Sequence, residues 1–164
     1  MNQAFLRLCS TGYVYYVALS RNPPLRSRIT LQKRGMFKLS ERFTKGLETM
    51  RQYVSEEELQ RMVTADALAD IAPDLRKFIV EYAYGDIYSR DGLSAKQRAL
   101  VVISSVVTQG AAPQTKTHIR RGLHAGLTEQ EIVEALLQLA PYIGFPRVQN
   151  ALVIAQEIFQ EASR

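Results

Sequence analysis

The 164-residue chain has a single cysteine, Cys9, and no tryptophan. One cysteine excludes an internal disulfide and a Cys-x-x-Cys redox pair, and it favours a reducing, cytoplasmic setting. No apolar run reaches the eighteen or so residues that a membrane-spanning helix needs. The sequence also lacks a His-Glu cluster at metal-ligand spacing and a glycine-rich phosphate loop, so neither a metal nor a bound cofactor is expected.

Acidic residues are absent from the first 35 positions, which contain six Arg or Lys. When these six are set aside, the formal charge falls from +5 for the chain to −1 over residues 36–164. A body so close to neutral argues against a broad nucleic-acid interface. The basic character belongs to the leader alone.

Residues 1–35 form a segment separate from the single domain expected over residues 36–164. An Arg-rich, acid-free leader is typical of an organelle transit peptide, and a short apolar stretch within it offers a secretory signal as an alternative. We favour a third interpretation, an upstream extension of the reading frame with translation starting at Met36, because Pro23-Pro24 breaks any regular structure before it. A disordered or partner-clamping arm remains the alternative.

From Phe37 onward the apolar residues recur at helical spacing, and no strand is expected. Ser55, Ser94 and Thr128 each stand three residues before a Glu or Gln, which is the capping-box signature of a helix start. The sequence therefore predicts an all-α fold of about six to seven helices. These helices are expected over residues 37–54, 56–69, 73–84, 95–109, 113–125, 129–139 and from 146 onward, with an irregular segment over 85–92.

His118 is the first candidate for catalysis, because imidazole is the side chain whose ordinary pKa lies nearest neutrality. Its helix is polar, with only Ile119 and Leu123 as large apolar residues. Arg121 lies one turn further along, so the two side chains can share a space. A surface helix with an incidental histidine is the alternative, and His124, at the helix end, is read as structural.

Arg98 opens the central apolar helix, where a cation opposes the helix dipole and so calls for a specific partner. That partner is either a substrate carboxylate or a nearby acid such as Asp86. Asp86 and Tyr88 lie on the irregular segment and suit a pocket wall or, equally, a subunit interface. Tyr142 is expected to join helices, with its hydroxyl as a candidate neighbour of His118.

Residues 81–159 resemble the carboxymuconolactone decarboxylase family, a group of small all-helical proteins. The matching pieces keep the family's order and spacing: Gly85-Asp86-Ile87-Tyr88-Ser89-Arg90, Gly92-Leu93 with Arg98, His118, Gly126-Leu127-Thr128 with Glu131-Ile132, and Tyr142 with Gly144-Phe145-Pro146. The resemblance implies that His118 is the recurrent active-site residue of the family.

The resemblance also separates two kinds of chemistry. A thiol-peroxidase branch uses Cys-x-x-Cys before the histidine and a Glu one helix earlier. Here those positions are Ala111, Gln114 and Ala99. A peroxidatic cycle needs a thiolate and a resolving thiol, so this branch is disfavoured.

The other branch decarboxylates 4-carboxymuconolactone in aromatic catabolism without a cofactor. The resemblance then implies His118, Arg98 and Asp86 as catalytic residues and Arg121, Tyr88 and Tyr142 as substrate-binding residues. It also implies a homo-oligomer, a trimer or hexamer, in which the long apolar helices pack across subunits. A thiol-peroxidase-type enzyme and a non-enzymatic small-molecule-binding protein are the alternatives.

Overall fold

A computed structural model describes residues 7–8, 14–15, 40–64 and 68–162. The predicted all-α class is confirmed, because apart from one two-residue ladder every regular element in these ranges is helical. That ladder pairs β1 (Arg7–Leu8) antiparallel with β2 (Val14–Tyr15), where no strand was expected. β-Branched and aromatic residues such as Val14 and Tyr15 favour this pairing. The proposed start at Met36 lies outside the described residues.

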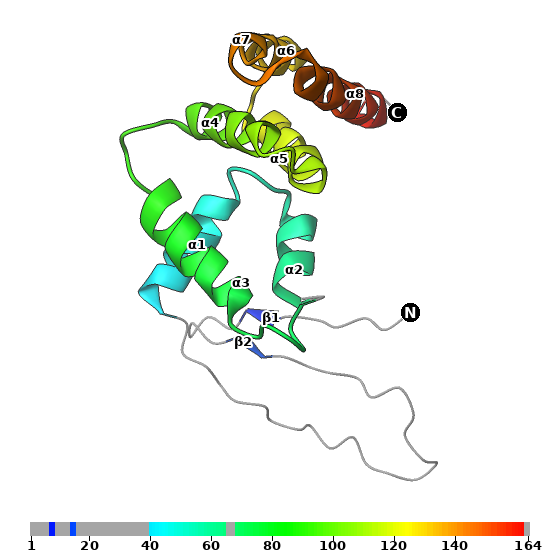
Figure 1. Cartoon of the computed structure of the whole chain (residues 1–164). Helices are drawn as coiled ribbons and strands as arrows, with labels where there is room; N and C mark the ends of the chain where they lie inside the picture. Colours follow the sequence, from blue (N-terminus) through cyan, green and yellow to red (C-terminus); the bar gives the residue numbers. More distant parts are fainter. Residues whose placement is uncertain (1–6, 9–13, 16–39, 65–67, 163–164) are drawn as a thin grey trace.

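The helices form two groups that lie one above the other in Figure 1. Their order along the chain is α1 (Glu41–Met50), α2 (Glu56–Thr64), α3 (Leu75–Phe78), η1 (Ile79–Tyr88), α4 (Ala95–Thr108), α5 (Ala112–His124), α6 (Glu129–Gln138), α7 (Ala140–Ile143) and α8 (Phe145–Ala162). The lower group contains α1, α2, α3 and η1, and the upper group contains α4 to α8. None of the described helices is long and apolar enough to cross a membrane.

The predicted helix starts at Ser94 and Thr128 are confirmed as complete capping boxes. The Ser94 hydroxyl accepts from the backbone N–H of Gln97 at 3.3 Å, and the Gln97 side chain accepts from the backbone N–H of Ser94 at 2.8 Å. After the C-terminal end of α5, Gly126 has φ +92° and allows the chain to reverse direction. These signals are local, so the sequence predicts where α4 and α6 begin and where α5 ends.

The core of the upper group lies between α4, α5, α6 and α8. Ile103, Ile119, Ile132, Leu136 and Ala155 are all 0% exposed. α4 buries only one stripe of its apolar surface, because Val101 on another side remains 60% exposed. The expectation of a central α4 is therefore correct for one face and leaves an apolar face uncovered.

The lower group is organised by the crossing of α1 and η1. η1 is a π-helix that continues to Tyr88, so the expectation of an irregular segment from residue 85 is wrong for its first four residues. A Cβ at Gly46 would lie 2.2 Å from the Val80 carbonyl oxygen, and one at Gly85 would lie 2.5 Å from the Arg42 carbonyl oxygen. The two backbones touch at both glycines, and this contact supports the wide helix that carries Tyr84 and Tyr88.

Candidate active site

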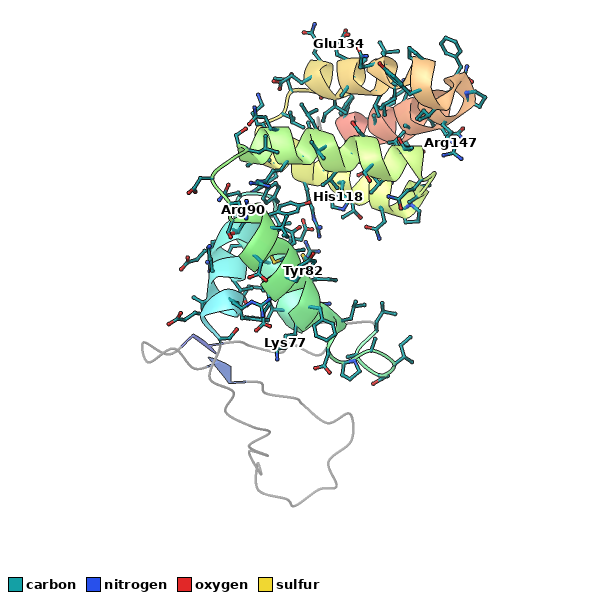
Figure 2. All side chains as sticks on the ribbon, turned by 60° about the vertical axis from the view of Figure 1, so that its left-hand side comes forward. Lys77, Tyr82, Arg90, His118, Glu134 and Arg147 are labelled. Atoms are coloured by element: carbon teal, nitrogen blue, oxygen red, sulfur yellow. The ribbon has the colours of Figure 1, made fainter. Side chains whose placement is uncertain are left out.

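His118 and Arg121 both lie on α5, whose residues divide into a buried stripe and a polar stripe. Thr115, Ile119 and Gly122 are buried. A Cβ at Gly122 would meet the Ile103 side chain at 3.0 Å, so α5 lies close to α4 on that side. His118 lies on the side of α5 that faces the α1–η1 group (Figure 2). The buried stripe of α5 therefore packs within the upper group, and His118 faces the lower group.

Arg121, on α5 of the upper group, contacts side chains of α2 and η1 in the lower group. Its side chain is only 14% exposed. Nη1 donates to the Tyr84 hydroxyl oxygen at 3.1 Å, and Nη2 lies 3.5 Å from the Met62 sulfur. Nη2 also lies 3.9 Å from Oε1 of Glu58, while the buried Nε–H has no hydrogen-bond partner. A buried cation with an unpaired donor is costly, so this guanidinium is suited to receive an anionic ligand.

His118 is half-buried one turn before Arg121. Burial, followed by the positive charge of Arg121, lowers the pKa of His118 from 6.5 to about 4. Both causes disfavour the imidazolium. The resting imidazole is therefore neutral at neutral pH, with one N–H to donate and one lone pair to accept. This state suits a hydrogen-bond donor to a developing oxyanion better than a ready proton source.

Three tyrosines pack around the Arg121 side of η1. The ring centroids of Tyr53 and Tyr84 are 5.9 Å apart, those of Tyr53 and Tyr88 are 5.2 Å apart, and those of Tyr84 and Tyr88 are 4.8 Å apart. Burial raises the pKa of each phenol, and that of Tyr88 reaches about 12. The cluster is thus neutral, and it gives the site an apolar wall with polar tips.

The structure places Arg98 and Asp86 in contacts of their own. Arg98 donates to the backbone carbonyls of Leu93, at 3.2 Å, and Arg90. Its charge still acts on the pKa of Tyr53 and Tyr88, so it lies at the edge of the tyrosine cluster. Asp86 pairs with Arg42 through both carboxylate oxygens. The charge that acts on the His118 pKa is that of Arg121.

The two predicted tyrosines differ in position. Tyr88 is part of the tyrosine cluster and also lines a cleft of about 360 Å³ beside Lys45 and Arg90. Tyr142 is 76% exposed on α7, a helix that packs against α6 and α8. The structure therefore brings together His118, Arg121 and Tyr84 with Tyr88 nearby, and leaves Tyr142 on the surface.

Sequence analysis missed Glu58, Met62 and Tyr53. Glu58 was assigned to the capping box of α2, and its backbone N–H does donate to the Ser55 hydroxyl at 3.2 Å. Its carboxylate, however, lies toward Arg121. Met62, one turn further along α2, belongs to the same apolar spacing as core residues. The one available signal was the i, i+4 spacing that places both residues on one face of α2.

A cleft of about 540 Å³ lies between α2, α3 and α5. It is lined by Glu58, Arg61, Met62, Arg76, Thr117 and Arg120. Glu58 and Met62, which both contact Arg121, also line this cleft, whereas Arg121 and His118 are not among its lining residues. Among the described residues, no group of three or more His, Cys, Asp or Glu side chains is arranged to hold a metal ion.

The chain matches the carboxymuconolactone decarboxylase family over residues 73–157. It is 30% identical to a 4-carboxymuconolactone decarboxylase of Acinetobacter baylyi over 74% of the chain and 89% of that protein. It is 36% identical to an uncharacterised 15.0 kDa protein of Paracoccus denitrificans over 58% of the chain and 72% of that protein. It is also 30% identical to a nitrosuccinic acid decarboxylase of Metarhizium robertsii over 73% of the chain and 82% of that protein.

Proposed function

The chain belongs to the carboxymuconolactone decarboxylase family, and we propose that it is a cofactor-independent decarboxylase acting on 4-carboxymuconolactone or a related carboxylated lactone. Two relatives with different substrates are both named as decarboxylases. The observation that carries the proposal is the buried Arg121 guanidinium, with an unpaired Nε–H, one turn from a neutral His118. A cytoplasmic setting, favoured by the single cysteine, is part of the same proposal.

The proposed reaction needs no cofactor because the unsaturated lactone accepts the electrons itself. The bond between the ring carbon and the leaving carboxylate breaks, and carbon dioxide departs. The electron pair moves through the ring double bond onto the lactone carbonyl oxygen and forms an enolate. A proton then adds to carbon to give the enol-lactone. The protein has to orient the substrate and stabilise the oxyanion.

Arg121 suits the carboxylate that the substrate retains. A cation that held the leaving carboxylate would stabilise the ground state more than the transition state, in which that negative charge is being lost. With the retained carboxylate on Arg121, the N–H of neutral His118 can donate to the lactone oxygen as negative charge develops there. The apolar tyrosine wall favours the loss of charge from the leaving group. We assign the final proton to solvent water, because the neutral His118 is not a ready proton source.

Arg98, Asp86, Tyr88 and Tyr142 have weaker support than His118 and Arg121. Arg98 and Tyr88 lie at the tyrosine cluster and remain candidates for contacting the ring. Asp86 is paired with Arg42, which fixes η1 against α1. For this single chain we assign Asp86 and Tyr142 no contact with the reacting atoms.

Turnover of the lactone by the purified protein tests the proposal. The lactone is made in situ from carboxymuconate by a cycloisomerase, and the enol-lactone product and carbon dioxide are followed together. Arg121→Gln is expected to raise KM about tenfold to a hundredfold, because one charge-assisted carboxylate pair is lost. Arg51→Gln is the matched control. Arg51 Nε lies 3.2 Å from Oε2 of Glu56, and this ion pair is not part of the site. Lactone binding without turnover would instead support the non-enzymatic alternative.

The thiol-peroxidase alternative has no support among the described residues. The two positions that would carry its cysteines are Ala111, at the start of α5, and Gln114, in the first turn of α5. The position of its glutamate is Ala99, buried in α4 and 5% exposed. Ala111 and Gln114 cannot supply a thiolate, and Ala99 cannot supply the carboxylate.

A further inference from the structure

The Nε–Nη2 edge of Arg121 lacks a good acceptor. The buried Nε–H has no partner, and Nη2 meets the Met62 sulfur at 3.5 Å, which is a weak acceptor. Glu58 Oε1 lies 3.9 Å from Nη2, beyond hydrogen-bonding distance. A planar carboxylate placed on this edge would satisfy Nε and Nη2 together. Glu58 therefore partly neutralises the charge of Arg121 but does not accept hydrogen bonds from Nε and Nη2.

Glu58 has room to move away from Arg121. Its side chain is 38% exposed, whereas the Arg121 side chain is 14% exposed. The Glu58 carboxylate also lines the cleft of about 540 Å³ together with Arg61, one turn further along α2, and Arg120 on α5. Arg120 is already paired with Glu161 at 2.5 Å. Arg61, whose Nε donates to the Glu57 backbone carbonyl at 3.4 Å, stands three residues after Glu58 on the same face of α2 and can supply compensating charge. A Glu58 carboxylate that leaves Arg121 can thus remain solvated and close to a cation.

The neighbouring glutamates of α2 do not share this position. Glu56 pairs with Arg51 at 3.2 Å. The pKa of Glu57 is lowered, first by its own backbone N–H and then by the Ser55 hydroxyl, so its carboxylate is directed to the helix start. All three acids stand in the first turn of α2 and interact similarly with the helix dipole. The contact with Arg121 distinguishes Glu58 from the other two.

From these contacts we propose that Glu58 is a specificity-determining residue that competes with the ligand carboxylate for Arg121 and moves into the α2–α5 cleft when an anionic ligand binds. The proposal rests on the proposed function, because Arg121 is the carboxylate-binding group of that site. Only a ligand that fills the Nε–Nη2 edge bidentately gains enough to displace Glu58. A neutral lactone does not compete with Glu58 for Arg121, so Glu58 lowers the affinity for carboxylated ligands alone and selects, among them, those that fill this edge bidentately.

Equilibrium binding to the full-length protein tests this proposal without relying on turnover. The probe is homocitric lactone, a saturated lactone with two carboxylates that lacks the double bond needed to release carbon dioxide. Isothermal titration calorimetry compares wild type, Glu58→Gln and the matched control Glu57→Gln. Both variants remove one negative charge from the same helical turn. Glu58→Gln is expected to bind the probe about threefold to fivefold more tightly, the range for a partly exposed ion pair.

Glu57→Gln is expected to stay within about twofold of wild type, and the neutral γ-butyrolactone is expected to show no difference between the variants. Equal binding of the probe by Glu58→Gln and Glu57→Gln would overturn the proposal, and so would weaker binding by Glu58→Gln. Arg121→Gln separates the two levels of the argument. If it binds the probe as tightly as wild type, the carboxylate assignment of the proposed function fails. If it binds weakly while both glutamate variants agree, only the role of Glu58 fails.

Discussion

At the residue scale, the site combines a neutral donor with a buried cation. Arg121 is fixed through Nη1 by the Tyr84 hydroxyl at 3.1 Å, and its charge helps to keep His118 unprotonated. The charge of Arg121 therefore affects the protonation state of His118. A neutral imidazole beside a guanidinium is suited to bind an anion and stabilise an enolate in one space.

The pH dependence of turnover tests the neutral state of His118. Its pKa in the folded chain is about 4, below the ordinary 6.5, so the neutral form persists as pH falls through that interval. We expect kcat/KM to remain level from pH 6.5 downward and to fall only as pH approaches about 4. The imidazole proton resonances of His118, assigned with His118→Ala, give the titration directly. A rate that rises on acidification below pH 6.5 would show that the imidazolium is the active form.

Sequence predicts residues at this scale when their role depends on local spacing. His118 and Arg121 lie one helical turn apart, and that spacing alone brings them together. Glu58 and Tyr84 reach Arg121 from α2 and η1, which are 63 and 37 positions away in sequence. No pattern within either helix indicates such a contact. Asp86 was predicted beside the site, whereas Arg42 of α1 engages it through a pairing 44 positions apart.

At the element scale, the crossing of α1 and η1 holds the lower wall of the site. Gly46 and Gly85 allow the two backbones to touch, and η1 then carries Tyr84 to Arg121. A side chain at either glycine would separate the helices. The position of the tyrosine cluster therefore depends on two residues that have no side chain.

Gly46→Ala tests this crossing. The added Cβ would lie 2.2 Å from a backbone oxygen of Val80, so the helices must shift. We expect the free energy of unfolding to fall by about 2 kcal/mol or more, as for other overpacked sites. Gly92→Ala is the control, because nothing lies within 4 Å of its Cβ. Urea unfolding gives both values, and equal stability of the two variants would contradict the close crossing.

The starts of α4 and α6 were predicted correctly, whereas the π-helical type of η1 was not. Ser94 and Thr128 cap their helices through contacts within three residues, so local sequence decides them. η1 is different, because nothing in its ten residues requires a π-helix. Val80 and Gly85 of η1 contact the backbone of α1 where η1 is π-helical. A local sequence pattern does not indicate contacts between distant segments.

At the scale of the whole molecule, an apolar stripe on α3 and η1 remains exposed. Leu75, Phe78, Ile79 and Tyr82 follow helical spacing and are 37%, 61%, 41% and 62% exposed. Figure 2 shows Tyr82 and Lys77 on the half of the molecule that faces away from α6. A contiguous apolar surface of this kind is typical of an interface. We propose that it packs against further copies of the chain in a trimer or hexamer.

Sedimentation velocity at micromolar concentration tests this assembly. The wild-type protein is expected to sediment as a trimer or larger, because the stripe is buried between copies. Phe78→Ser removes one large apolar side chain from the stripe and is expected to shift the distribution toward monomer. Lys77→Ser is the neighbouring control and should keep the wild-type state. A monomeric wild-type protein would contradict the proposed assembly.

The most direct test of the whole account is kcat/KM for lactone decarboxylation by a matched pair of histidine variants. His118→Ala removes the proposed donor to the enolate oxygen, whereas His124→Ala removes an exposed imidazole from the end of the same helix. We predict a loss of about a hundredfold to a thousandfold for His118→Ala and a change within about twofold for His124→Ala. Equal activity of the two variants would contradict the assignment of His118 to the chemistry.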